Sequence, residues 1–268
     1  MSATFIEDPR VVSGRPEVWW TLQEGVATVC MNRPASKNSL RVADMVAVGQ
    51  AFVDACGVGA RAVLIRGEAG AFCAGRDLKD TRPDSDDTLA ILRDQINPAL
   101  ARVQDCEVPT IAEIAGPALG FGFGLALACD IAVVADDAVM GSPFRNIGAV
   151  LDSGAHFHLR ERLGRHRAAE LIFTGRLVSG REAAAVGLVN RSVGANDLPA
   201  FVQSLARAIA TGPTGAFRAS KRILRCEGNA AELADLEAQA QAQALAGPDA
   251  REGIQAFKDK RRPRFVGR

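Results

Sequence analysis

Backbone amide groups, more than reactive side chains, are the first candidates for chemistry in this sequence. Residues 120–124, Gly-Phe-Gly-Phe-Gly, follow an apolar run that begins at Pro109, and they should open a helix. Each glycine inside a helix costs about 1 kcal/mol relative to alanine. The glycines must therefore bring a benefit that offsets this cost, and two interpretations are open. The glycines either allow another backbone to pack closely, or they let a ligand reach the free N–H groups of the first turn, where the helix dipole favours negative charge.

A second loop of the same type lies earlier in the chain. Residues 71–78, Ala-Phe-Cys-Ala-Gly-Arg-Asp-Leu, follow a short apolar strand predicted over 62–66. Two backbone N–H groups that such loops bring to one point can form an oxyanion hole for a reacting carbonyl oxygen. A dinucleotide-binding fingerprint fits less well, because Leu125 stands where its third glycine belongs.

Asp152 is a candidate acid or base with two interpretations. It lies just before a helix predicted from residue 153, where it either caps the helix or transfers a proton, and the two roles are compatible. His156 and His158 follow closely, but residues two apart on a helix point in different directions. We therefore expect no joint catalytic role for these histidines and no metal site.

Composition narrows the classes of function. The 268 residues include 32 basic and 31 acidic side chains, so the net charge of +1 provides no overall field for nucleic acid or an anionic membrane. Six cysteines lack any C-x-x-C pair, which favours reduced thiols in a cytoplasmic protein. We find neither a secretory leader nor an apolar run long enough for a membrane span.

The predicted elements that must position these loops change character along the chain. Residues 1–17 are predicted as an N-terminal arm, 18–196 as the core domain, and 197–268 as a helical C-terminal region. In the core we expect a hairpin over 18–31, a helix over 40–56 capped by Ser39, strands at 62–66, 110–114, 131–135 and 138–141, and a long helix over 87–106. After residue 153 helices dominate, at 153–163, 165–173, 179–186, 197–210, 214–226, 229–246 and 248–260, with one strand at 188–193. The alanine-rich segment 230–246 has a small apolar face, which favours subunit contacts.

Several ordered motifs together resemble one family. They are N-R-P-A-S-K-N-S-L (32–40), A-F-C-A-G-R-D-L-K (71–79), P-T-I-A-E-I-A-G-P-A-L-G-F-G (109–122), A-C-D-I-A-V-V-A (128–135) and F-T-G-R-L-V-S-G-R-E-A-A-A-V-G-L-V-N (173–190). The sequence is identified as resembling the enoyl-CoA hydratase/isomerase, or crotonase, superfamily over nearly its whole length. The resemblance implies an α/β fold, a spiral of β-β-α units with a helical C-terminal region, assembled as a homotrimer or homohexamer.

The resemblance also implies a ligand and its contacts. The ligand is an acyl-CoA thioester, so coenzyme A is part of the substrate and no separate cofactor is expected. The backbone N–H groups of Arg76 and Phe121 match the oxyanion donors, although the family usually has glycine at the second position. The positions implied to contact the substrate are Ala35, Lys37, Ala74, Asp77, Leu78, Lys79, Gly122, Phe144, Phe257, Lys258 and Lys260.

Departures from the family pattern indicate the reaction. Hydratases of this family use two glutamates to activate water, and the matching positions here are Gly124 and Phe144. Asp152 instead matches the single catalytic acid of several isomerases, so we expect an acyl-CoA isomerase that shifts a double bond or rearranges an epoxy or enoyl group. A hydratase with an unidentified acid and a non-catalytic acyl-CoA-binding protein are the alternatives.

Three further charged residues have less definite roles. Asp77 and Asp130 do not match the proton-transfer position of the family, so we interpret both as structural. The guanidinium of Arg76 has three candidate partners: Asp77, a carboxylate of the substrate, or a phosphate of coenzyme A.

Overall fold

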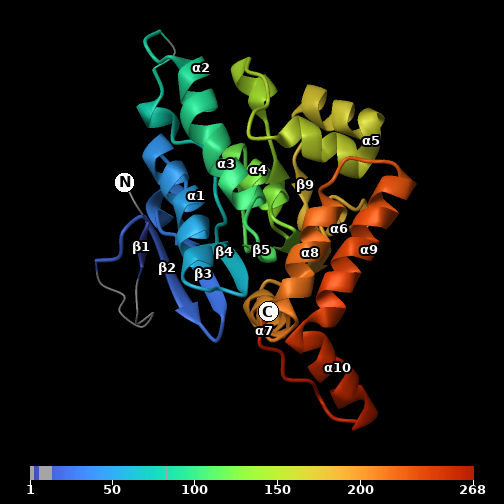
Figure 1. The fold of residues 1–268 in the computed structure, drawn as a ribbon. Coiled ribbons are helices and arrows are strands. Elements are labelled where there is room, and N and C mark those ends of the chain that lie inside the picture. The colour runs from blue at the N-terminus through green and yellow to red at the C-terminus, as the bar shows by residue number, and fades with distance from the viewer. Residues whose placement is uncertain (1–2, 6–13, 83) are drawn as a thin grey trace.

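Two β-sheets and the helices between their strands form the N-terminal part of the molecule, and a helical region follows (Figure 1). The computed structural model describes residues 3–5, 14–82 and 84–268, and structural statements refer to these. The larger sheet has seven strands in the order β1 (Thr4–Phe5), β2 (Val18–Gln23), β3 (Val26–Met31), β4 (Ala62–Gly67), β5 (Thr110–Ile114), β7 (Ile131–Ala135) and β10 (Arg191–Val193). The smaller sheet consists of β6 (Ala118–Leu119), β8 (Val139–Gly141) and β9 (Val178–Ser179).

The helices alternate with the strands at first and then form the whole C-terminal region. Those of the core are α1 (Val42–Gly57), α2 (Thr88–Ala90), a π-helical turn η3 (Ile91–Ile96), α3 (Asn97–Gln104), α4 (Phe121–Ala128), α5 (Ala155–Thr174) and α6 (Gly180–Ala185). The C-terminal helices are α7 (Leu198–Ala210), α8 (Thr214–Leu224), α9 (Ala230–Ala246) and α10 (Pro248–Lys258). Short 3₁₀ turns occur at η1 (Pro34–Ser36), η2 (Leu78–Asp80) and η4 (Phe144–Ile147). No helix of the described ranges combines the length and apolar character that crossing a bilayer requires.

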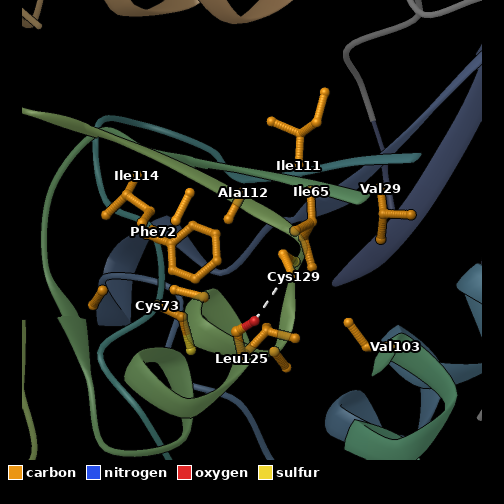
Figure 2. Close-up of a cluster of buried hydrophobic side chains, with 14 of the residues drawn as sticks. Val29, Ile65, Phe72, Cys73, Val103, Ile111, Ala112, Ile114, Leu125 and Cys129 are labelled. Atoms are coloured by element: carbon orange, nitrogen blue, oxygen red, sulfur yellow. Dashed lines mark hydrogen bonds between the residues drawn. The ribbon is translucent and has the colours of Figure 1, made fainter. Parts of the chain in front are cut away.

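The central strands are buried along their length because both faces of the sheet are covered. Every residue of β5 is buried, as is most of β3 and β4, which is typical of strands with helices on both sides. α1 packs on β2 and β3, while α7 contacts β3, β4, β5 and β7. Figure 2 shows Leu125 of α4 and Cys129, which follows the helix, facing a cluster that includes Ile65 and Phe72. The core thus holds α4, the helix that opens with the glycine-rich turn.

Local sequence signals explain much of this fold. The predicted hairpin forms, with β2 and β3 antiparallel and Gln23 opposite Val26. Its two turn residues, Glu24 and Gly25, have φ angles of 50° and 77°, as a tight two-residue turn requires. The predicted helix over 87–106 forms as α2, η3 and α3 in succession. The helices predicted on either side of residue 164 form α5, which is interrupted at Gly164 (φ 73°, ψ 167°).

Two expectations differ from the structure at the edges of elements. Ser39 does not cap α1, because the N-cap is Arg41. Leu40 forms a β-bridge with Arg76, so the helix begins only at Val42. The predicted arm over 1–17 includes β1, which pairs in parallel with β2. The remainder of that arm before residue 14, residues 1–2 and 6–13, lies outside the described residues.

Candidate active site

The two glycine-containing loops meet at the N-terminus of α4. The Cys73 N–H donates to the Pro117 carbonyl oxygen at 2.9 Å, and the Leu119 N–H donates to the Cys73 carbonyl oxygen at 2.9 Å. Gly75 and Gly120 have φ angles of 100° and 53°. A Cβ on Gly75 would lie 2.8 Å from the Leu119 carbonyl oxygen. The loops therefore touch backbone to backbone, which only glycine permits here.

This contact leaves two backbone donors beside each other at one end of α4. Leu40 donates to the Gly75 carbonyl oxygen at 2.8 Å and accepts from the Asp77 N–H at 2.9 Å. Gly75 and Asp77 thus both face Leu40, and the N–H of Arg76, the residue between them, points away from Leu40, since successive N–H groups of an extended chain alternate. Phe121 is the first residue of α4, so its N–H has no partner within the helix. Among the described residues, none accepts a hydrogen bond from either of these N–H groups.

Phe121 occupies its position without backbone strain. The positive φ angle of this turn belongs to Gly120, and Phe121 already has helical geometry. Its side chain is buried in the core. The change from the usual glycine therefore leaves the backbone donor in place.

A buried asparagine connects the first loop to the segment that contains Lys37. Asn38 is completely buried, and its side-chain amide donates to the carbonyl oxygens of Glu68 and Ala71, each at 2.9 Å. The Ala74 N–H donates to the Lys37 carbonyl oxygen at 3.0 Å. Sequence analysis had not singled out Asn38, although it is part of the motif at 32–40.

Asp152 approaches the first turn of α4 through its neighbour Ser153. A Cβ on Gly124 would lie 2.2 Å from the Ser153 carbonyl oxygen, so the two backbones are in direct contact. Ser153 and Gly154 have φ angles of 57° and 73°, which turn the chain sharply after Asp152. The Ser153 hydroxyl donates to Asp152 Oδ1 at 2.7 Å.

The carboxylate of Asp152 does not cap the following helix. The N-cap of α5 is Gly154, and it has no side-chain capping hydrogen bond. Burial raises the pKa of Asp152 above its ordinary value, while the Ser153 hydrogen bond and the positive charge of Arg76 oppose that rise. A carboxylate with a raised pKa is a stronger base, which suits proton transfer from carbon.

The Arg76 side chain pairs with one carboxylate and acts at longer range on another. Its guanidinium is 3.5 Å from Asp86 Oδ2, and its charge also acts on Asp152. Asp77, which sequence analysis offered as a partner, binds Arg33 instead, with 2.9 Å between Arg33 Nη2 and Asp77 Oδ2. That hydrogen bond to Arg33, with one from the Lys79 N–H, lowers the pKa of Asp77.

The geometry thus combines two unpaired N–H donors, a helix N-terminus and one carboxylate, and comparison with known proteins explains the combination. A family model for enoyl-CoA hydratase/isomerase matches residues 21–268. The chain belongs to the enoyl-CoA hydratase/isomerase family. Members of this family are enzymes that act on acyl-CoA thioesters, so the resemblance read from the motifs is confirmed.

Relatives and solved structures support the same family and fold. The chain is 37% identical over 256 residues to enoyl-CoA hydratase domain-containing protein 2, mitochondrial, of Bos taurus, covering 91% of this chain and 85% of that protein. It is 35% identical over 253 residues to human methylglutaconyl-CoA hydratase, mitochondrial, covering 91% of this chain and 74% of that protein. The crystal structure of enoyl-CoA hydratase from Bacillus anthracis superposes with a TM-score of 0.88 at 29% identity, covering 94% of this chain and 100% of that one. The predicted crotonase-type α/β fold is confirmed.

The two positions that match the glutamates of hydratases in this family are filled without carboxylates. Gly124 is closed by the Ser153 backbone, so a larger residue has no space there. The Phe144 ring lies against the turn before α4: its Cε1 atom would lie 3.1 Å from a Cβ on Gly120. An apolar ring therefore lies against Gly120, next to the Phe121 N–H, at a position where those hydratases carry an acid.

The remaining predicted substrate contacts fall into two groups. The first group belongs to the loops and the segment bonded to them: Gly122 packs against Cys73, the Ala74 N–H donates to the Lys37 carbonyl oxygen, and the side chains of Ala35, Lys37, Leu78 and Lys79 are exposed. Phe257, Lys258 and Lys260 belong to α10 and the residues after it, and they too are exposed. α10 lies well apart from α4 in Figure 1, so a single chain does not bring this second group to the loops.

Other candidate residues have structural partners. Lys221 Nζ lies 2.6 Å from Asp130 Oδ2, which also accepts from the backbone N–H and hydroxyl of Thr110 at 2.8 and 2.9 Å. His156 is exposed, whereas His158 is buried and lies 3.2 Å from Gln104 Nε2. Burial lowers the pKa of His158 to about 4. No cluster of metal-binding side chains occurs in the described residues.

Sequence reasoning missed the residues that hold Asp152 and Arg76 in place. Ser153 positions the carboxylate, and Asp86 pairs with the guanidinium. The Ser-Gly dipeptide after Asp152 was the sequence signal for the role of Ser153, because two consecutive residues in left-handed conformation favour a glycine. Nothing local indicates Asp86, which comes from the acidic segment before α2.

Proposed function

We propose that this protein is an acyl-CoA isomerase in which Asp152 transfers a proton between two carbons of the acyl chain. The observation that carries the proposal is the position of Asp152. It is joined through Ser153 to the first turn of α4, while Gly124 and Phe144 provide no acid for activating water.

The reaction follows from the arrangement of donors and base. The thioester carbonyl oxygen accepts hydrogen bonds from the Arg76 and Phe121 N–H groups, which stabilise the enolate oxygen; one such donor contributes about 3 to 4 kcal/mol to the transition state. Asp152 removes a proton from one carbon, and the electron pair moves into the enolate. The protonated carboxyl then returns the proton to the carbon at the other end of the delocalised system, so the double bond shifts and no atom is gained or lost.

Hydration is the second candidate, because several relatives carry the printed name hydratase. It requires an acid or base other than the two glutamates. Incubation with 2-enoyl-CoA and 3-enoyl-CoA, followed by mass analysis, separates the reactions. We expect interconversion at constant mass. A product heavier by one water would overturn the isomerase proposal, and tight thioester binding without turnover of any enoyl, epoxy or dienoyl substrate would indicate a binding protein.

We further propose that the chain assembles as a homotrimer or homohexamer. The C-terminal helices leave several large apolar side chains exposed: Leu224, Leu236, Leu245, Ile254 and Phe257. A cavity of about 1100 Å³ lies among α8, α9 and α10. In an assembly, the basic residues after Ala256 are free to approach the Lys37 segment of another copy and the phosphates of coenzyme A.

The assembly is tested by light scattering on the protein and on Leu245→Glu. We expect a trimer or hexamer at micromolar concentration, and an association at least about 100-fold weaker in the variant, because the new charge is buried without a partner. Glu237→Ala on the same helix serves as the control. A monomeric wild-type protein would contradict the proposal.

A cytoplasmic location also stays a prediction, since relatives include mitochondrial proteins.

A further inference from the structure

Two thiols from different segments meet outside the candidate active site. Cys56 lies in the last turn of α1, and Cys106 follows the end of α3. Their Sγ atoms are 3.2 Å apart, and both cysteines are reduced. Cys106 is 5% exposed, whereas Cys56 is half-buried and thus the more exposed of the two.

Packing of α1 on α3 brings the sulfurs together. Gly49 of α1 touches the backbone of Ala99 in α3, where a Cβ would lie 2.6 Å from the Ala99 carbonyl oxygen. Cys56 follows Gly49 by the same chain length as Cys106 follows Ala99. The two segments run side by side between these contacts, so their C-terminal ends stay in register and hold the thiols at one place.

The surroundings give the two thiols unequal reactivity. The hydrogen bond from Cys106, together with the backbone N–H groups of Val108 and Glu107, lowers the pKa of Cys56 below that of an ordinary thiol. The same hydrogen bond and burial raise the pKa of Cys106. Cys56 is therefore the thiol that ionises first, and the thiolate is the form that reacts with oxidants.

We propose that Cys56 and Cys106 form a reversible redox site that reacts with hydroperoxides. The Cys56 thiolate attacks the peroxide oxygen, forming a sulfenic acid and releasing hydroxide or alkoxide. The Cys106 sulfur then attacks the Cys56 sulfur and displaces hydroxide, which takes up the Cys106 proton as water. The released alkoxide or hydroxide takes up the proton that Cys56 lost on ionising. In the net reaction two thiols are oxidised to one disulfide, and an organic hydroperoxide yields one alcohol and one water, or hydrogen peroxide yields two waters.

The other cysteines do not compete for this role. Burial raises the pKa of Cys30, Cys73 and Cys129 to about 12. Cys226 is exposed, but within the described part of the chain its sulfur contacts the Arg222 carbonyl oxygen and no second sulfur. Closing the Cys56–Cys106 bond requires the sulfurs to approach by about 1 Å, since bonded sulfurs lie about 2.0 Å apart. The bond links segments 50 positions apart in the chain, so it should raise the thermal midpoint by several degrees.

Hydrogen peroxide added to the full-length protein tests the proposal. We expect two of the six thiols to disappear first, with a mass loss of two hydrogens, a disulfide mapped to Cys56 and Cys106, and recovery of both thiols with dithiothreitol. Oxidation of Cys226 before this pair, a disulfide mapped elsewhere, or six remaining thiols would each overturn it.

Single serine variants separate the two roles. Cys106→Ser should stop at a Cys56 sulfenic acid that dimedone traps, and Cys56→Ser should give neither product. Cys226→Ser, the matched control at an exposed thiol, should form the disulfide at the wild-type rate. Equal dimedone labelling of the Cys56→Ser and Cys106→Ser variants would contradict the assignment of Cys56 as the attacking thiol. The wild-type peptide map decides the proposal even if one variant fails to fold.

Discussion

α4 and α9 are helices of opposite kinds. α4 is short, contains two glycines and two phenylalanines, and has every residue buried. α9 is more than twice as long, is rich in alanine, and has no buried residue in the single chain. Asn229 caps α9 through hydrogen bonds to the N–H groups of Ala231 and Glu232, whereas the N-cap of α4 is Gly120, which has no side chain.

The difference shows what keeps each helix in place. α9 has strong intrinsic propensity and a capped start, and within the chain it contacts α8 and α10. α4 has poor propensity and is held by contacts: Gly122 against Cys73 and Gly124 against Ser153. Those same contacts hold the segments of Cys73 and Ser153, and with them the loop of Arg76 and the residue Asp152, against α4. The proposed catalytic residues therefore lie at the helix that tertiary packing stabilises, and the proposed assembly surface includes the helix with the stronger intrinsic propensity.

The largest expected effect concerns the residue that packing places beside α4. Asp152→Asn retains the size of the side chain and an acceptor for the Ser153 hydroxyl but removes the base. We expect kcat to fall about 100-fold to 10,000-fold, as for loss of one general acid or base. Exchange of the α and γ hydrogens of the substrate with solvent deuterium, measured by mass spectrometry, should be lost in parallel.

Stability provides the control for this variant. The pKa of Asp152 is raised in the folded protein, so ionising it at neutral pH opposes folding. Asp152→Asn removes that charge and should not lower the thermal midpoint. A helix cap would behave differently, with a loss of about 1 kcal/mol in stability and exchange intact. Unchanged exchange would leave the isomerase proposal without its base.

A pH profile is the next largest effect. Below its pKa the Asp152 carboxyl is protonated and cannot accept a proton, so kcat/KM should fall about tenfold per pH unit on the acid side. Because burial raises this pKa, the decline should begin at a higher pH than the ordinary aspartate value of about 3.9 implies. Rates of substrate hydrogen exchange, measured across the pH range, locate this decline. A decline centred below that ordinary value would contradict the assignment.

Adding one methyl group to α4 tests whether packing holds it. In Gly124→Ala the new Cβ meets the Ser153 carbonyl oxygen at 2.2 Å, so we expect a loss of about 1 to 3 kcal/mol in unfolding free energy and a lower kcat, because Asp152 moves. Chemical denaturation measures the change in unfolding free energy. Gly253→Ala in α10 is the control: its Cβ would make an ordinary 3.4 Å contact with Phe265, and higher helix propensity should leave stability equal or better.

The smallest effect is expected on α9. Ala238→Gly changes an exposed position in the middle of this helix and should cost about 1 kcal/mol in helix stability. Substrate exchange should stay at the wild-type rate, since α9 does not contact the donors in the single chain. A loss of activity like that of Gly124→Ala would remove the distinction between the two helices.

Local signals in the sequence determined most of the elements. The hairpin over 18–31, the glycine-rich turn before α4 and the capped helix after Asn229 follow from turn chemistry, propensity and capping, which act between residues near in the chain. The ordered motifs identified the family, because several fixed spacings rarely coincide by chance. Helix ends were less certain: Ser39 suited an N-cap, yet the Leu40–Arg76 bridge moved the start of α1.

Only the tertiary structure decided how the site is put together. The approach of Gly75 to Leu119 and the contact of Gly124 with Ser153 join segments that are distant in sequence, and no local propensity encodes such a meeting. The pairing of charged side chains was likewise decided by the tertiary structure: Arg76 pairs with Asp86, and Asp77 with Arg33. Their pairing depends on distance in space and on burial, so the pKa of Asp152 and the close approach of Cys56 to Cys106 emerge only once the chain is folded.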